Sequence, residues 1–223
     1  MTQELKRVEK LPAKRVVTIP GGSGGKRYEI CCVDALDDRR EMELRGSGYA
    51  FLDRVLVYEI RLKRFSGPEP GLPNGITVRC DRDFTEELYE LAQSVFLTDR
   101  RFHLHPLFDA NAAAPVLRAY IDDCREKEMK LFKAYHGETL LGFTVVDERA
   151  DGDGKYFENV LGAAKADLRG KLAAPALYEY MLRTQQERFT CYLGRVSSSN
   201  AASINLHSHL GGKVVRIYDQ FII

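Results

Sequence analysis

The chain has 223 residues and a formal net charge of +1, with 44% hydrophobic and 29% charged residues. A chain of this length can bury one sizeable core or two small ones, and its balanced charge excludes a basic surface that would attract nucleic acid or anionic lipid. No run approaches the roughly 20 apolar residues of a membrane span, and residues 1–17 lack the apolar centre of a signal peptide. We therefore expect a cytoplasmic protein with neither nucleic-acid nor membrane partners.

Residues 1–26 carry mixed charge and end in GGSGGK, a composition typical of a flexible lead-in. The next stretch, 27–66, predicts a strand, a short helix and a second strand with a period of two. This β-α-β piece is too small to stand alone and must pack on something. Pro and Gly are dense just after it, so we assign 67–75 to a linker and 76–223 to a C-terminal domain.

The C-terminal domain opens with a strand at 76–80 and an amphipathic helix within 81–96. An irregular segment follows at 97–112, where aromatic, basic and imidazole groups crowd together. A second helix at 113–127 and a β-hairpin at 129–148 complete this half of the domain.

The last third alternates strands and helices, which predicts a mixed α/β fold. We expect a strand at 156–164, a turn at 165–174, a helix from Pro175 to about residue 189, and a strand at 190–196. Because free amides at a helix N-terminus bind phosphate, the turn is a candidate pyrophosphate site. Its predicted binding residues are Arg169, Gly170, Lys171, Leu172, Ala173 and Ala174.

Two motifs in this region point to a known superfamily. Arg169 and Ala174 fit the pattern Arg/Gln-x-x-Gly-x-Gly/Ala, with Leu172 in place of its central glycine. Further on, the pattern Asn-x-x-Ala-x-x-x-Tyr-x-x-x-Gly-Phe is met by Asn200, Ser203, His207 and Gly211, with Gly212 in place of phenylalanine. From about residue 76 to its end, the chain therefore resembles the GCN5-related N-acetyltransferases.

That resemblance implies a central, mostly antiparallel sheet with one parallel, splayed pair of strands, preceded here by the small β-α-β piece. Within the superfamily the chain looks like the amino-sugar enzymes similar to dTDP-fucosamine acetyltransferase. The residues that carry this closer likeness are Asp99, Arg101, Phe102, His103, Pro106, Tyr120, Ile121, Gly142 and Phe143.

The resemblance also implies a cofactor, acetyl-CoA, and a set of site residues. Asn200 and Ser203 would contact coenzyme A, and the backbone near Leu161, Gly162 and Ala163 would meet the oxyanion. His207 stands where the family has a tyrosine, and an imidazole with a pKa of about 6.5 can protonate the leaving thiolate. The alternative is that His207 only fills space on a helix.

Two further roles are predicted on the acceptor side. Glu158 is the candidate general base, acting directly or through water, although an exposed strand glutamate is the commoner finding. Arg101, Phe102 and His103 would supply charged and aromatic contacts to a nucleotide-sugar, unless they only pack the loop.

No metal site is predicted. In a helix, His207 and His209 would point about 200° apart, and no carboxylate or cysteine completes a set with them or with His103 and His105. The five cysteines are scattered and contain no C-x-x-C pair, so we expect free thiols.

The first functional hypothesis is an acetyl-CoA-dependent N-acetyltransferase that acts on a small amine, an amino-sugar or nucleotide-linked amino-sugar, through a tetrahedral intermediate. A second is a catalytically inactive module of the same fold that binds an acyl-CoA or a protein partner. It is motivated by Leu172 and His207, which both depart from the family pattern. A third is a structural unit that forms a homodimer.

Overall fold

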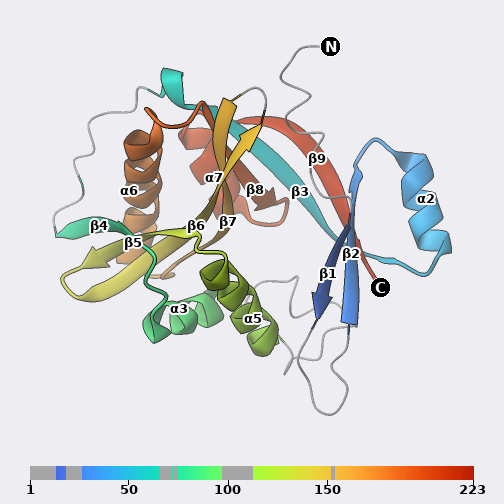
Figure 1. The fold of residues 1–223 in the computed structure, drawn as a ribbon, viewed down its shortest axis with the longest axis horizontal. Helices are drawn as coiled ribbons and strands as arrows, with labels where there is room; N and C mark the ends of the chain where they lie inside the picture. Colours follow the sequence, from blue (N-terminus) through green and yellow to red (C-terminus); the bar gives the residue numbers. More distant parts are fainter. Residues whose placement is uncertain (1–13, 19–26, 66–71, 73–74, 97–112, 152–153) are drawn as a thin grey trace.

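A computed structural model describes residues 14–18, 27–65, 72, 75–96, 113–151 and 154–223 of the chain (Figure 1). These residues form a mixed α/β structure. The strands are β1 (Lys14–Thr18), β2 (Arg27–Asp34), β3 (Ala50–Arg61), β4 (Ile76–Asp81), β5 (Lys130–His136), β6 (Thr139–Asp151), β7 (Gly154–Ala164), β8 (Cys191–Ser197) and β9 (Lys213–Ile222). The helices are α2 (Asp38–Gly46), the 3-10 turn η1 (Leu62–Arg64), α3 (Glu86–Phe96), α5 (Ala113–Glu126), α6 (Leu168–Gln185) and α7 (Ala201–His209).

All these strands join one sheet in the order β1-β2-β9-β3-β8-β7-β6-β5-β4. Seven neighbouring pairs are antiparallel and one, β7 with β8, is parallel. The predicted fold class, a mostly antiparallel sheet with a single parallel pair, is confirmed.

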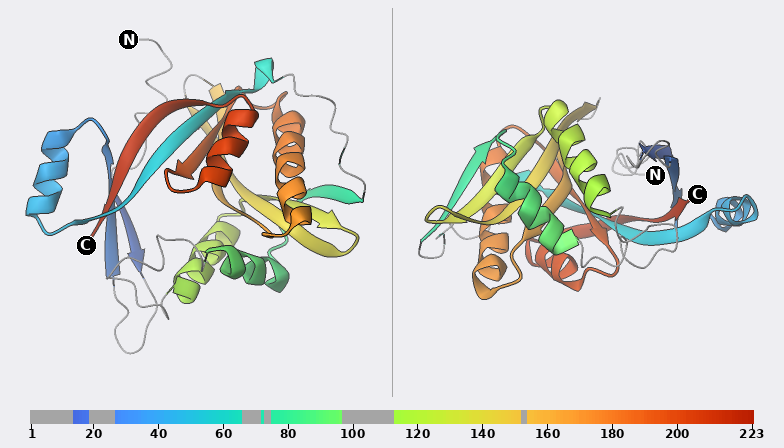
Figure 2. Two further views of the ribbon diagram at one scale, coloured as in Figure 1. Left: turned by 180° about the vertical axis from the view of Figure 1, so that it is seen from behind. Right: turned by 90° about the horizontal axis from the view of Figure 1, so that it is seen from below.

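Helices cover both faces of the sheet. Figures 1 and 2 show α6 and α7 on one face and α3 and α5 on the other. The alternation of side chains along a strand supplies both cores: in β5, Leu131 packs with α3 and α5, whereas Phe132 packs with α6. Both side chains are fully buried.

The N-terminal piece is part of the same sheet. β3 lies between β8 and β9 and is antiparallel to both, and β2 lies on the far side of β9. The division into a subdomain at 27–66, a linker at 67–75 and a domain at 76–223 stays a prediction. The described strands of the first part nevertheless pair with the last strands of the chain.

Two local expectations are wrong. Residues 14–18, which fall in the segment predicted as a flexible lead-in, form β1 and pair with β2. Helix α6 begins at Leu168 and not at Pro175, because Asp167 caps it and its side chain accepts a hydrogen bond from the Gly170 amide. Pro175 therefore lies inside the helix, where it deprives the Lys171 carbonyl of its usual donor.

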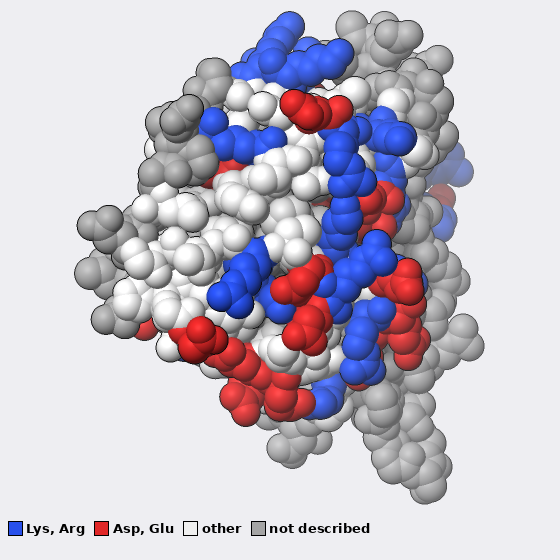
Figure 3. Space-filling model, turned by 60° about the vertical axis from the view of Figure 1, so that its left-hand side comes forward, with Lys and Arg blue, Asp and Glu red and all other residues white. Residues whose placement is uncertain are grey.

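Charges are mixed on the surface. On the face that Figure 3 presents, Lys and Arg side chains alternate with Asp and Glu, which fits the net charge of +1. None of the helices that the structure describes is long and apolar enough to cross a membrane.

Helix α7 packs closely on β8 through a glycine. A Cβ atom at Gly194 would overlap the imidazole of His207, and it would also lie 3.1 Å from the Tyr192 hydroxyl. The imidazole has little room to move aside, because His207 is only 1% exposed and is in contact with three tyrosine rings. Gly194 is therefore needed for the approach of the helix.

We expect Gly194→Ala to lower the free energy of unfolding by about 1–3 kcal/mol, the usual cost of overpacking a core. Chemical denaturation monitored by circular dichroism measures it. Gly46→Ala at the end of α2 is the matched control, because a Cβ there meets nothing within 4 Å, and it should be neutral or slightly stabilising. Equal stability of both variants would show that α7 can shift away from β8.

Candidate functional site

The parallel strands β7 and β8 part within the sheet. They pair at three positions only, from Tyr156 with Cys191 to Glu158 with Leu193. Beyond these, β7 continues along β6 to Ala164, while β8 continues along β3 to Ser197. This is the splayed pair that the sequence predicted.

Strand β7 is bulged at the point where the two strands part. Val145 of β6 pairs with Leu161 and Val146 pairs with Asn159, so Val160 is an extra residue in the ladder. Further along, the Lys165 amide donates to the Leu141 carbonyl of β6 at 2.8 Å. The alternation of an antiparallel ladder then directs the amides of Gly162 and Ala164 away from β6, toward the gap.

The three predicted oxyanion residues differ in their surroundings. The side chains of Leu161 and Ala163 are buried in the cluster formed with α3 and α5. Gly162 faces α6 instead, where a Cβ would lie 3.0 Å from the Tyr178 hydroxyl. By the alternation of the ladder, the amides of Leu161 and Ala163 face β6. Of the three predicted residues, Gly162 is thus the one whose amide faces the gap.

The predicted pyrophosphate residues lie in the first turns of α6, not in a turn ahead of it. The Gly170 amide is bonded to the Asp167 side chain at 2.8 Å, and the Lys171 amide to the Asp167 carbonyl at 3.1 Å. Leu172, Ala173 and Ala174 lie deeper in the helix, where each amide has an acceptor four residues back.

The side chains of this helical start point in different directions. Ala173 is buried, Ala174 is half-buried, and Lys171 and Leu172 are exposed, Leu172 by 50%. Gly170 lies against the Lys165 backbone so closely that no Cβ fits. Arg169 belongs to the helix, and its side chain lies outside the described residues. A phosphate at this end would also meet the Asp167 carboxylate, which repels it.

Asn200 and Ser203, predicted to bind the cofactor, contact each other. Asn200 is the N-cap of α7, and its side-chain oxygen accepts a hydrogen bond from the Ser203 amide at 2.9 Å. Both lie at the helix start that follows β8, so α7 begins close to the strand that borders the gap.

His207 is buried in an aromatic cluster. Its ring lies 5.4–5.8 Å, centroid to centroid, from the rings of Tyr58, Tyr178 and Tyr192. Its Nδ1 lies 2.8 Å from the Ser203 carbonyl and its Nε2 lies 3.0 Å from the Tyr192 hydroxyl. Burial lowers the pKa of His207 below its usual value. The ring is therefore neutral near pH 7, with its proton on Nδ1, because a carbonyl can only accept.

Glu158 lies at the last position where β7 pairs with β8. Two arginines bind its carboxylate, one on each oxygen. One carboxylate oxygen is 2.7 Å from Arg149 and the other is 2.7 Å from Arg195 of β8. The residue is only 3% exposed. To act as a base, Glu158 would have to release one of these guanidinium groups.

A polar network beside the gap was not assigned a role from the sequence. Asn159 donates to Thr144, to the Leu161 carbonyl and to the Tyr178 hydroxyl, the last two at 3.3 Å. The Tyr178 and Tyr192 rings lie edge to face, with 6.3 Å between their centroids. Tyr178 and Tyr192 resemble core aromatics in the sequence. The available sequence signal was that Tyr192 and Gly194 alternate along β8, which places a tyrosine and a residue without a side chain on the same face of this strand.

Arg101, Phe102 and His103 lie outside the described residues. Among the described residues, no group of three or more His, Cys, Asp or Glu is arranged to hold a metal ion.

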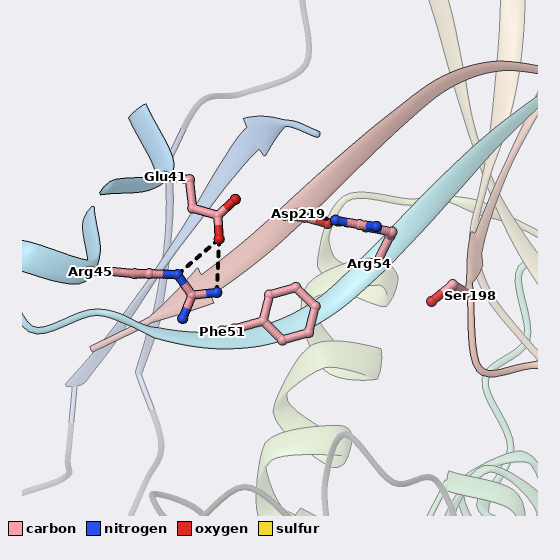
Figure 4. A pocket seen from close by; sticks show the side chains of 6 residues that line it. All are labelled: Glu41, Arg45, Phe51, Arg54, Ser198 and Asp219. Atoms are coloured by element: carbon pink, nitrogen blue, oxygen red, sulfur yellow. Dashed lines mark hydrogen bonds and ion pairs between the residues drawn. The ribbon is translucent and has the colours of Figure 1, made fainter. Parts of the chain in front are cut away.

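A surface hollow of about 400 Å³ lies where β3 and β9 approach α2 (Figure 4). It is lined by Glu41, Arg45, Phe51, Arg54, Ser198 and Asp219. Arg54 binds Asp219 through two hydrogen bonds of 2.7 and 2.8 Å, and Arg45 pairs with Glu41 at 2.8 Å. Because these charges are paired with each other, we assign no binding role to the hollow.

Comparison with known proteins gives structural neighbours only. No protein-family model matches the chain, and no curated protein matches it in sequence. A tandem GNAT protein from the clavulanic acid biosynthesis pathway is similar at a TM-score of 0.57 and 14% identity, over 94% of this chain and 63% of that one.

Two further solved structures agree. A GCN5-related N-acetyltransferase from Sphaerobacter thermophilus matches at a TM-score of 0.53 and 16% identity, over 98% of this chain and 63% of that one. A protein from Enterococcus faecalis V583, named a probable N-acyltransferase, matches at 0.56 and 11%, over 86% and 44%. This chain thus spans less than two thirds of each of these three neighbours, and what it shares with them is the fold of the GCN5-related N-acetyltransferases.

Proposed function

We propose that the protein is an acetyl-CoA-dependent N-acetyltransferase acting on a small amine, an amino-sugar or a nucleotide-linked amino-sugar. The observation that carries the proposal is the pair β7 and β8, which part after Glu158 and Leu193 and leave the Gly162 amide facing the gap. Structural neighbours named as acetyltransferases support acyl transfer in general. A cytoplasmic location and a homodimer stay predictions.

In this proposal the gap holds the acyl end of the cofactor. Acetyl-CoA supplies an activated thioester, whose carbonyl oxygen gains negative charge during transfer. The Gly162 amide is placed to donate a hydrogen bond to that oxygen. The small residues Gly162 and Gly194, one on each strand, let Tyr178 and His207 approach the two strands closely. For the other end of the cofactor, the proposed contacts are Asn200, Ser203 and the start of α6, where Asp167 is an unfavourable neighbour.

The acceptor class rests on Arg101, Phe102 and His103, the segment most like the amino-sugar enzymes. A guanidinium forms strong hydrogen bonds with phosphate, and an aromatic ring can stack on a base or cover a sugar. A nucleotide-linked amino-sugar presents all of these groups together with the amine.

The direct test is release of coenzyme A from acetyl-CoA in the presence of an amine panel that includes free and nucleotide-linked amino-sugars, amino acids and polyamines. We expect turnover that depends on an amino-sugar. Binding of acetyl-CoA without turnover of any amine would favour the inactive module, and absence of binding would contradict both.

Arg101→Ala should raise the KM for a nucleotide-linked amino-sugar by about 10-fold or more, the cost of one lost charge-assisted hydrogen bond. Its KM for acetyl-CoA should not change, since the two substrates use different contacts. Steady-state kinetics with each substrate varied in turn measures both. Arg118→Ala, on the exposed side of α5, is the control. An unchanged acceptor KM would remove Arg101 from the acceptor site.

Glu158→Gln should lower the free energy of unfolding by about 2 kcal/mol, because it leaves the partly buried Arg195 without its carboxylate partner and Arg149 with Asp147 alone. If Glu158 is also the base, kcat at pH 7 falls by about 100-fold or more and is partly restored at higher pH, where the acceptor amine is already neutral. Denaturation and a pH series measure the two effects. A stability loss with unchanged kcat would leave Glu158 only the role of holding Arg195.

A further inference from the structure

An ion pair joins β7 and β8 at the point where the two strands part. Glu158 is the last residue of β7 that pairs with β8, and Arg195 lies two positions beyond its ladder partner, Leu193. The Nη2 atom of Arg195 lies 2.7 Å from a carboxylate oxygen of Glu158. A contact between side chains therefore bridges the strands where their backbone pairing ends.

This ion pair lies on the face of the sheet away from α6 and α7. The side chain of Asn159 bonds to a tyrosine of α6, so the neighbouring Glu158 points to the opposite face. A Cβ at Gly194 would meet a histidine of α7, so Arg195 also points away from these helices. The proposed contacts for coenzyme A belong to α6 and α7. An acceptor would thus reach the gap from the side of Glu158 and Arg195.

Arg195 has donors available for a ligand. A guanidinium carries five N–H donors. Arg195 binds Glu158 through Nη2, and its buried Nε has no hydrogen-bond partner among the described residues. Arg149, the other arginine on Glu158, is also bound to Asp147 at 2.9 Å. The Arg195 side chain is 28% exposed, so an anion in solution can reach its guanidinium.

The charges at this point are balanced, and a ligand of one sign would disturb them. The ion pairs around Glu158 join two carboxylates to two guanidinium groups. Glu158 is buried, and its ladder partner Leu193 belongs to a buried apolar cluster. Removing one member of a buried ion pair is costly. An ammonium that displaced Arg195 from Glu158 would leave the guanidinium unpaired, whereas a ligand that also carries an anion supplies a partner to each.

We propose that Arg195 binds an anionic group of the acceptor, a phosphate or a carboxylate, while the acceptor ammonium replaces Arg195 at Glu158. The acceptor is then an amino-sugar that carries a negative charge on the same molecule, and a neutral amino-sugar is a poor ligand. This inference rests on the proposed function. It also gives a partner to the guanidinium that Glu158 must release before it can act as a base, since guanidinium groups bind phosphate and carboxylate strongly.

The first experiment measures binding without turnover. Isothermal titration calorimetry is done on the full chain with coenzyme A, which has no acetyl group to transfer. The ligands are glucosamine, glucosamine 6-phosphate, 2-amino-2-deoxyglucuronic acid and UDP-glucosamine, each beside the same sugar without its amine. We expect one of the three anionic amino-sugars to bind at least about 10-fold more tightly than glucosamine and than its own amine-free analogue, a difference of about 1.4 kcal/mol. The tightest of the three identifies a sugar phosphate, a carboxylate or a nucleotide diphosphate as the source of the charge.

Variants assign this preference to one guanidinium. Arg195→Gln should bring the anionic and neutral amino-sugars within about 3-fold of each other, because the anion loses its partner. Arg149→Gln removes the other guanidinium from Glu158 and should keep the preference. Arg188→Gln, which pairs with Glu148, is the control for the loss of a positive charge. If circular dichroism shows Arg195→Gln to be unfolded, Arg195→Lys takes its place. Lysine keeps the charge without the planar fork, and the preference should fall by about 3-fold or more.

The second experiment measures coenzyme A release from acetyl-CoA with the same amino-sugars. In the wild type, kcat/KM should be at least about 10-fold higher for the preferred anionic amino-sugar than for glucosamine. Arg195→Gln should lose this difference through the KM for the sugar, while its KM for acetyl-CoA stays within about 3-fold of wild type. Arg188→Gln should keep the difference.

The inference and the proposed function fail in different ways. A wild type that binds and acetylates neutral and anionic amino-sugars equally well would overturn the role of Arg195 and leave acetyl transfer standing. The same holds if Arg195→Gln keeps the preference, or if Arg149→Gln loses as much of it. Binding of an anionic amino-sugar that depends on Arg195, without release of coenzyme A, would overturn the proposed function and keep the binding site. Absence of binding by all the sugars would overturn the inference.

Discussion

The gap between β7 and β8 arises because each strand follows its outer partner. All seven residues of β8 pair with β3, and β7 pairs with β6 almost from end to end. Between themselves the two strands share three paired positions. Because each strand follows the twist of its own outer ladder, the two strands part where their mutual pairing ends. The bulge at Val160 adds to this divergence, because a bulge bends its strand. The amides of Gly162 and Ala164 face the gap because of this divergence.

Much of the fold could be predicted because its signals are local. The alternation in β3, the hairpin of β5 and β6 and the apolar stripe of α3 each lie within about 20 residues, and the order of elements then indicated a mixed α/β sheet. The place of β3 between β8 and β9 could not be predicted in this way. Nothing within residues 50–61 records a pairing with strands that lie more than a hundred residues further on.

The start of α6 was mispredicted because the motif was given more weight than the N-cap signal of Asp167. The glycine pattern and Pro175 suggested a turn at 165–174, yet Asp167, three residues before Gly170, is a good N-cap. The side-chain hydrogen bond of Asp167 competes directly with the amides that the motif would offer to phosphate. Asn200 was predicted to contact coenzyme A, and in the structure its side chain accepts a hydrogen bond from the Ser203 amide. The contacts of Tyr178 and Tyr192 with His207 arise where α6, β8 and α7 meet, and in the sequence only the alternation of Tyr192 and Gly194 along β8 pointed to them.

The pairing of β3 also affects how the protein folds. Asp53 and Ser197, which are hydrogen-bonded, lie 144 positions apart, and Arg54 and Asp219 lie 165 apart. During synthesis, β3 leaves the ribosome long before either neighbouring strand exists. One of its edges stays unpaired until β8 at 191–197 is made, and the other until β9 at 213–222 is made. Such distant contacts form slowly and late. The helices and the hairpin of β5 and β6 can form earlier, whereas the divergence of β7 and β8 waits for β3 to enter the sheet. The candidate site and the complete sheet then form in the same late step of folding.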